Sequence, residues 1–317
     1  MQPDVSVIIA AYNAEAGIAR AIRSALEQQG VTVEVIVADD CSTDHTAAVA
    51  RTFVGDGVRL VRLPHNLGPG GARNAGLLAA TGQWLAILDS DDVMRPDRLA
   101  RMIALGKARN ATIVTDNPEV VQAGLTEGEV MFPRAMLAAV PEISLADFIE
   151  SNVIFKSTFN YGYMKPVFDR SFIEGQALRY DETLRIGEDY TFLASALAKG
   201  GRCVVDPAPG YVYNIRQESI SRVLEQKHVA GMLAADARFQ RTHDLDPAAR
   251  AAFLRRQRSL RQAASFLSLV QHLKDRAPVK ALGAALRDPA AVRHLKMPIM
   301  ARLQRYAPSF AVRGKTS

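Results

Sequence analysis

Residues 84–92 read WLAILDSDD, an apolar run followed by three carboxylates within four positions. A short apolar run that ends abruptly in polar residues is typical of a buried strand. Carboxylates this close repel one another and are costly to desolvate, so they require solvent or a cation among them. The stretch therefore predicts a buried strand that delivers negative charge at its carboxyl end.

The residues before this stretch repeat a pattern of apolar strand followed by helix. Strand-like runs and helical runs alternate over residues 5–12, 15–28, 34–40, 42–53, 58–63 and 71–81. Continuous apolar strands joined by helices indicate an α/β fold with a mostly parallel sheet covered on both faces. Ligands of such sheets bind beyond the carboxyl ends of the strands. Those ends hold Tyr12, Asp39, Asp40, Asp89 and Asp91.

The rest of the chain divides into two further parts. After residues 1–110, residues 111–221 contain a Pro- and Gly-bearing stretch at 117–142, predicted to be mostly loop. A short helix is predicted near 144–151 and another from Glu188 to a Gly-Gly pair. Residues 222–317 are predicted to be helical throughout.

The composition is that of a globular protein. Of 317 residues, 48% are hydrophobic and 23% charged, which allows a sizeable core. Cys41 and Cys203 have no C-x-x-C partner, so neither a zinc site nor a disulfide framework is indicated. No run resembles a signal peptide or approaches the roughly 20 apolar residues of a membrane span. We therefore expect a cytoplasmic protein without a nucleic-acid partner.

The net charge of +6 is unevenly distributed along the chain. Residues 222–317 hold 19 Lys or Arg against 6 Asp or Glu, whereas the preceding residues are acidic. The basic part has two compatible interpretations: a helical cap on the preceding α/β region, or a docking surface for the anionic inner face of a membrane. Arg255, Arg256 and Arg258 are the candidates for such docking.

Asp89, Ser90 and Asp91 admit two interpretations. An Asp-rich turn after a strand is often a solvated turn or a helix cap. However, Mg²⁺ and Mn²⁺ prefer oxygen ligands, commonly one or two carboxylates completed by substrate phosphates and water. The strand context favours half of a metal site, with a diphosphate as the other half.

Two residues at neighbouring strand ends could hold a nucleotide base. Asp39 could accept a hydrogen bond from a base N–H such as uracil N3, or could cap a helix. Tyr12 could stack on the base, or could pack at the edge of the sheet.

The stretch NLGPGGARNAG (66–76) leads glycines and Arg73 into a helix. It lacks the third glycine of a dinucleotide-binding fingerprint and follows the third strand, so a nicotinamide cofactor is rejected. A glycine-rich entry to a helix with an arginine still suits phosphate neutralisation.

Glu188 and Asp189 open a helix, where acidic residues are expected for dipole reasons alone. An enzyme that transfers a group to a hydroxyl nevertheless needs a carboxylate to take the proton from that hydroxyl. Both interpretations remain open from the residues themselves.

Taken together, these motifs resemble glycosyltransferase family 2, the inverting nucleotide-sugar transferases of GT-A fold. The matching stretches are VSVIIAAYN, VIVADDCSTD, NLGPGGARNAG, WLAILDSDD and GEDYTFLASAL. Within the family, FNYGYMKPVF and LRIGEDYTFL are most similar to bacterial exopolysaccharide glucosyltransferases of the succinoglycan type.

The resemblance implies a GT-A domain with a Rossmann-like sheet, followed by a C-terminal helical extension. It implies a UDP-sugar donor, glucose first among the sugars, a lipid-linked saccharide acceptor and Mg²⁺ or Mn²⁺. Asp91 and Asp89 would be the metal ligands. Asp189 would be the catalytic base, with Glu188 beside it. The residues in contact with the nucleotide-sugar would be Ala10, Tyr12, Asn13, Asp39, Arg73, Asp89, Ser90, Lys165 and Arg216.

The sequence departs from the family pattern at several positions. Ala10 stands where the family usually has Pro, and Asn214 and Arg216 occupy positions that often hold Arg and His, which removes a His metal ligand there. The Q-x-x-R-W signature of processive synthases is absent, which favours a single transfer per encounter. Two alternatives stay open: a non-catalytic nucleotide-sugar-binding protein and a sugar-phosphate nucleotidyltransferase.

Overall fold

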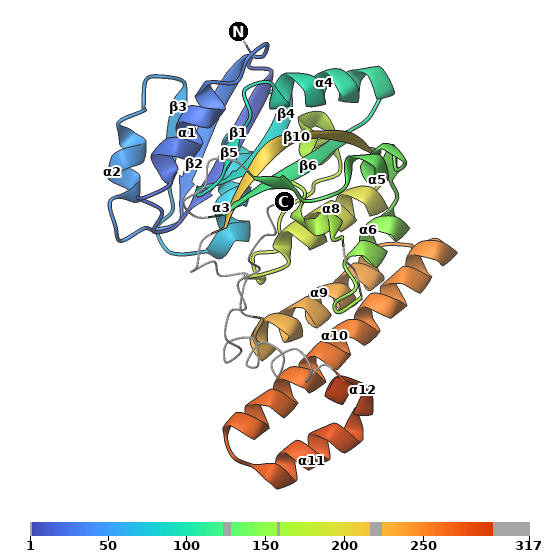
Figure 1. Ribbon diagram of the computed structural model, residues 1–317. Helices are drawn as coiled ribbons and strands as arrows, with labels where there is room; N and C mark the ends of the chain where they lie inside the picture. The colour runs from blue at the N-terminus through green and yellow to red at the C-terminus, as the bar shows by residue number, and fades with distance from the viewer. Residues whose placement is uncertain (1, 123–127, 157–158, 216–223, 294–317) are drawn as a thin grey trace, which may run out of the picture.

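The computed structural model describes residues 2–122, 128–156, 159–215 and 224–293 (Figure 1). A ten-stranded mixed sheet forms the centre, with helices on both faces, so the predicted α/β class is confirmed. The strand order is β3-β2-β1-β4-β9-β6-β10-β5, with β7 beside β6 and β8 beside β10. The strands are β1 (Val5–Ala11), β2 (Val33–Asp39), β3 (Val58–Arg62), β4 (Trp84–Asp89), β5 (Val93–Met94), β6 (Ile113–Gln122), β7 (Glu129–Val130), β8 (Glu142–Ile143), β9 (Val167–Asp169) and β10 (Cys203–Ile215).

The first four long strands run parallel, as the sequence predicts. Their register places Ala11 beside Asp39 and Ala10 beside Asp89, so the polar residues at the strand ends gather at one edge. Beyond β4 the sheet is mixed, because β9 runs antiparallel to both of its neighbours.

Helices cover the two faces of this sheet. In chain order they are α1 (Ile18–Leu26), α2 (Thr46–Arg51), α3 (Gly68–Ala79), α4 (Arg98–Arg109), α5 (Arg134–Ala138), α6 (Leu145–Ser151), the 3₁₀ turn η1 (Tyr161–Tyr163), α7 (Arg170–Gly175) and α8 (Glu188–Ala198). Alternate residues of the strands enter separate cores: Ile8 and Leu85 belong to one, Val7 and Ala86 to the other. A Cβ atom at Gly76 would lie 2.3 Å from Ile8 Cγ2, so this glycine permits the close approach of α3 to β1.

The prediction of a mostly loop region at 117–142 is wrong. β6 continues through Asn117 and Pro118 to Gln122, and β7, α5 and part of β8 follow within the same stretch. Proline normally argues against an internal strand because it lacks a backbone N–H. Here Pro118 lies opposite Tyr211, directly after a register shift in β10, where the pairing is already irregular.

The C-terminal region is helical, as predicted, over its described residues. It contains α9 (Gln226–Thr242), α10 (Pro247–Lys274), α11 (Pro278–Arg287) and α12 (Pro289–Val292). Phe239 and Phe253 join the core that also contains Phe148 and Tyr190, so α9 and the first part of α10 pack on the α/β body. The far end of α10 carries α11 and α12 away from the sheet (Figure 1). Among the described residues, no helix is both long and apolar enough to cross a bilayer.

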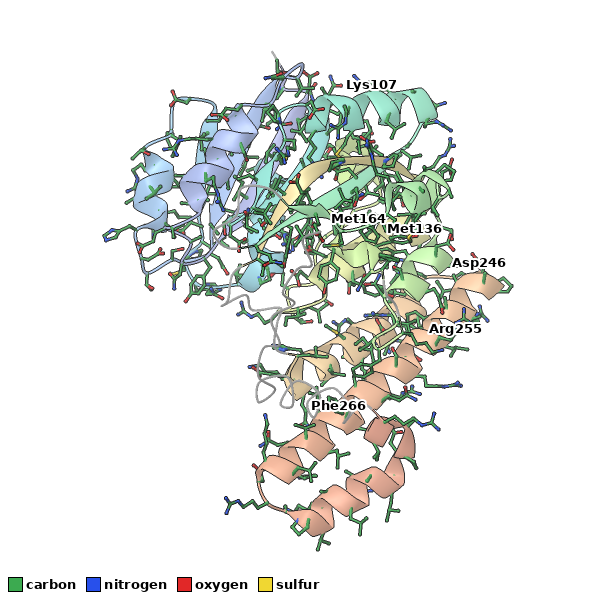
Figure 2. All side chains as sticks on the ribbon, viewed as in Figure 1. Lys107, Met136, Met164, Asp246, Arg255 and Phe266 are labelled. Carbon is green, nitrogen blue, oxygen red and sulfur yellow. The ribbon has the colours of Figure 1, made fainter. Side chains whose placement is uncertain are left out.

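The three arginines expected to dock on a membrane have different environments. Arg256 is 4% exposed; its NH1 donates to the Asn152 carbonyl, and its Nε lies 3.3 Å from Asp236 Oδ2. Arg255 pairs with Glu150 at 2.7 Å on the surface of α10, where Figure 2 labels it, and Arg258 is exposed. The expectation is therefore wrong for Arg256, whose side chain belongs to the interior.

Candidate active site

The turn after β4 is held by residues of β10. The Asp89 backbone N–H donates to Tyr211 Oη at 3.1 Å, and the Tyr211 hydroxyl donates to Asp92 Oδ2 at 2.7 Å. The Asn214 backbone N–H donates to the other Asp92 oxygen at 2.8 Å. Burial, followed by the nearby Asp89 and Asp91 carboxylates, raises the pKa of Asp92 to about 7. One of the three clustered carboxylates is thus a buried structural group.

Asp91 follows in the same turn and is partly exposed, as are Asp89 and Ser90. The Asp91 carbonyl accepts hydrogen bonds from Arg20 at 2.9 Å and from the Asn214 side chain at 3.0 Å. These contacts fix the backbone of Asp91.

Glu188 and Asp189 directly follow a glycine whose backbone lies in the left-handed region. This residue, Gly187, has φ 94°, which residues with a side chain rarely adopt, and it directly precedes α8. A Cβ atom there would lie 3.3 Å from the Met232 side chain of α9. The turn places Glu188 and Asp189 in the first turn of α8.

Arg73 connects these carboxylates to Asp89. From α3, its NH2 lies 2.9 Å from Asp89 Oδ1, and its NH1 lies 2.6 Å from Glu188 Oε1 and 2.8 Å from Asp189 Oδ1. Arg73 is buried, and a buried guanidinium requires such partners.

Lys165 makes a second bridge across the same site. Its Nζ lies 2.8 Å from Asp89 Oδ2 and 2.9 Å from Asp189 Oδ2. The Lys165 carbonyl accepts a hydrogen bond from Arg98 at 2.5 Å, and Arg98 forms a fully buried pair with Asp116. The short segment before β9 is thereby anchored, and the ammonium is held between the two carboxylates.

The charges of this cluster perturb one another. Burial alone would raise the pKa of Asp89, but Lys165 and Arg73 outweigh it and hold that pKa well below its usual range. Burial opposes the charged form of Lys165, yet Asp189 and Asp89 raise its pKa above the usual value. Burial and the adjacent Asp189 raise the pKa of Glu188, against the effect of Arg73. Asp89 and Lys165 therefore both stay ionised at neutral pH.

The residues predicted to contact the nucleotide lie at the same edge of the sheet but differ in their exposure. Tyr12 is 48% exposed, and Ala10 is partly exposed beside Asp89. The Asp39 carboxylate is fully buried, with Arg62 Nε donating to it at 3.0 Å and the Ser42 backbone N–H at 3.2 Å. These donors engage both oxygens, and the contact of Asp39 with a base stays a prediction.

Asn13 and Asp40 hold the surrounding loops. Asn13 Oδ1 accepts from the Thr43 backbone N–H at 2.9 Å, which ties the loop after β1 to the loop after β2. Asp40 accepts from the backbone N–H groups of Leu67 and Gly68 at 2.7 and 2.8 Å, at the entry to α3. Arg216 lies outside the described residues.

The donor set at the end of β4 suits a hard divalent ion only in part. Asp89 and Asp91 supply oxygen ligands of the kind that Mg²⁺ and Mn²⁺ prefer. Both Asp89 oxygens contact Arg73 or Lys165, and no cluster of three or more His, Cys, Asp or Glu able to hold a metal exists in the described part of the chain. The described residues therefore offer part of a divalent-ion site, which the oxygens of a diphosphate would have to complete.

Sequence reasoning missed how Lys165, Tyr211 and Asn214 contribute. Lys165 follows an aromatic stretch without periodicity, and nothing local indicates that it reaches both Asp89 and Asp189. Asn214 departs from the family pattern, and that departure does not by itself indicate that Asn214 fixes the turn that carries Asp91.

Comparison with known proteins agrees with this geometry. Residues 6–172 match the profile of Glycosyl transferase family 2. The chain belongs to this family. This glycosyltransferase is 55% identical over 310 residues, 97% of the chain and 88% of the relative, to the succinoglycan biosynthesis protein ExoO of Rhizobium meliloti (strain 1021). It is also 33% identical to ExoU of the same organism, over 96% of the chain and 90% of ExoU.

A shorter match covers 41% of this glycosyltransferase and 51% of WfgD of Escherichia coli, at 32% identity. WfgD is described as a UDP-Glc:alpha-D-GlcNAc-diphosphoundecaprenol beta-1,3-glucosyltransferase. Two solved structures share the fold. One is S. aureus TarS 1-349 in complex with UDP-GlcNAc, with a TM-score of 0.66, 19% identity and coverage of 90% of this chain and 92% of TarS. The other is the mannosyltransferase PcManGT of Pyrobaculum calidifontis with GDP-Man and Mn²⁺, with a TM-score of 0.62, 18% identity and coverage of 96% and 81%.

Proposed function

We propose that this glycosyltransferase moves a sugar, glucose first among the candidates, from a UDP-sugar to a lipid-linked saccharide during exopolysaccharide synthesis. Transfer proceeds with inversion at the anomeric carbon. The observation that carries the proposal is the pair of bridges from Arg73 and Lys165, which hold Asp89 and Asp189 in one site. This arrangement joins the donor side of the reaction to a carboxylate that can act as a base.

Asp189 takes the proton from the acceptor hydroxyl. As that oxygen attacks, its bond to the anomeric carbon forms while the bond between that carbon and the diphosphate oxygen breaks. A carboxylate has about four lone-pair sites, so Asp189 can accept a bond from the hydroxyl while it keeps Arg73 and Lys165. Their positive charge orients Asp189 and Asp89 and prevents the two carboxylates from repelling each other.

A divalent cation belongs to the proposal as a companion of the donor. Asp91 would bind Mg²⁺ or Mn²⁺, with Asp89 close by. The diphosphate of the donor would supply the other ligands. When bound, the ion would neutralise the negative charge that develops on the departing UDP. Arg73 and Ser90 lie at the same edge and could contact the donor. Tyr12 and Asp39 are the proposed contacts to uracil.

The relatives support the choice of substrates. ExoO and ExoU are succinoglycan biosynthesis proteins, and WfgD acts with UDP-Glc on a diphosphoundecaprenol-linked sugar. Such an acceptor would place this chain at the inner face of the membrane. We therefore propose that the chain is cytoplasmic and associates peripherally with an anionic membrane surface.

A thermal-shift panel of UDP-, GDP- and dTDP-sugars, with and without Mn²⁺, tests the donor. We expect UDP-glucose with Mn²⁺ to raise Tm most. Donor turnover is then measured on lipid-linked saccharide. Binding without turnover on any acceptor would favour a non-catalytic nucleotide-sugar-binding protein. Release of pyrophosphate from a nucleoside triphosphate and a sugar phosphate would favour a nucleotidyltransferase.

A further inference from the structure

The tip of the helical hairpin formed by α10 and α11 carries apolar side chains on its outside. Val279, Leu282 and Leu286 of α11 are 82%, 61% and 71% exposed. Their spacing of three and four residues puts them on one side of the helix. The opposite side packs toward α10 and α12, where Ala281 is buried. The exposed apolar stripe is therefore not needed for the packing of α11 among the described residues.

Basic side chains flank this stripe. Lys280 and Arg287 are seven residues apart, so they share a side of α11 next to the apolar one. Lys274 and Arg276 are exposed at the turn between the two helices. Of the two acidic residues nearby, Asp288 is the N-cap of α12, and the exposed Asp275 accepts a hydrogen bond from the Gln271 side chain at 2.9 Å. A short helix with an apolar stripe and a positive flank has the pattern of a segment that lies in the plane of a membrane interface.

The position of the hairpin agrees with its chemistry. Figure 1 shows α11 at the end of the molecule farthest from the sheet. Figure 2 labels Asp246, Arg255 and Phe266 in order along α10 toward that end. Helix α10 has 28 residues and is about 42 Å long. A membrane in contact with α11 would therefore lie well away from the contact between Arg256 and Tyr190.

We propose that the tip of the α10–α11 hairpin docks on an anionic lipid bilayer, with Val279, Leu282 and Leu286 inserted at the level of the headgroups and Lys280 and Arg287 contacting anionic lipid. The inference deepens the proposed function, since it supplies the means by which the chain meets a lipid-linked acceptor. Its evidence is independent of the catalytic site. It also transfers the docking role from the arginines of α10 to the tip of the hairpin.

The test is flotation of the full chain with phosphatidylcholine vesicles and with vesicles that also contain phosphatidylglycerol. We expect binding to the anionic vesicles only. Leu282→Ser with Leu286→Ser should weaken it by about tenfold or more, and Lys280→Glu with Arg287→Glu by a similar factor. All four side chains are exposed, so Tm should be unchanged.

Matched controls come from the body-proximal part of α10. Leu254→Ser and Arg258→Glu alter an exposed apolar and an exposed basic residue away from the tip, and both should bind vesicles like the parent. Equal losses in controls and tip variants would overturn the proposal, as would no binding by the parent chain.

Two other outcomes would also overturn it. A parent dimer that the Leu282 and Leu286 changes convert to a monomer, measured by light scattering, would assign the stripe to a second copy. A fall in Tm in those variants would assign it to residues 294–317 of the same chain. Hydrolysis of UDP-glucose by the parent chain is measured in parallel in membrane-free solution. If the parent does not hydrolyse UDP-glucose, that result would count against the proposed function and not against the docking proposal.

Discussion

Arg256 places its guanidinium carbon 3.5 Å from the ring centre of Tyr190. Tyr190 directly follows the proposed base in α8, so a residue of the C-terminal helices supports the start of the catalytic helix. The same guanidinium faces the buried Asp236. Burial raises the pKa of Asp236, and Arg256 opposes that rise. The contact links α8, α9 and α10.

Replacing Arg256 should therefore destabilise the whole catalytic unit. Removing one partner of a buried ion pair leaves the other uncompensated, so we expect Arg256→Ala to lower the free energy of unfolding by about 3–5 kcal/mol. Urea unfolding followed by circular dichroism measures this. Arg255→Ala is the matched control, because its exposed pair with Glu150 should contribute about 1 kcal/mol or less. Equal effects of the two substitutions would contradict the assigned environments.

Asp189→Asn should separate binding from transfer. The amide keeps the size of the side chain but cannot take a proton at neutral pH, so turnover should fall by about 10²–10⁴-fold. The affinity for UDP-glucose should stay within a few-fold of the parent, as measured by calorimetry. Glu174→Gln, an exposed change on α7, is the control. Normal transfer by the Asn variant would require another base.

Metal binding should depend on the nucleotide. Because the described residues contain no complete metal cluster, Mn²⁺ alone should bind weakly, and UDP should increase its affinity strongly. Electron paramagnetic resonance of free Mn²⁺ measures this directly. Asp91→Ala should remove the mutual enhancement, while UDP binding without metal persists. Tight Mn²⁺ binding in the absence of UDP would show that the protein has a complete site of its own.

The two thiols should react very differently. Burial raises the pKa of the Cys203 thiol to about 12, so at pH 8 this thiol is neutral as well as inaccessible. Cys41 is partly exposed. Iodoacetamide should modify Cys41 alone in the folded chain and both thiols in denaturant, as read by mass spectrometry. Modification of Cys203 before unfolding would show that its strand opens in the native state.

The parallel part of the sheet follows from local patterns, and so does the meeting of Tyr12, Asp39 and Asp89 at one edge. Apolar runs and helical periodicity suffice for both. The contacts of Lys165 depend instead on how an aperiodic segment closes over the sheet. The course of β6 through Pro118 was missed because a bulge in the partner strand makes proline tolerable. The burial of Arg256 was missed because arginine on a helix usually faces water.

The profile match ends at residue 172, before α8 with the proposed base and before α9 and α10, which supply Asp236 and Arg256. Phe239 and Phe253 complete the same core as Phe148 and Tyr190, so a fragment trimmed to the recognised boundary, or cut at 221, would leave that core open to water. We therefore expect a stable fragment of this enzyme to extend at least through the first half of α10. The stretch that matches the family profile is therefore shorter than the stretch that completes the core.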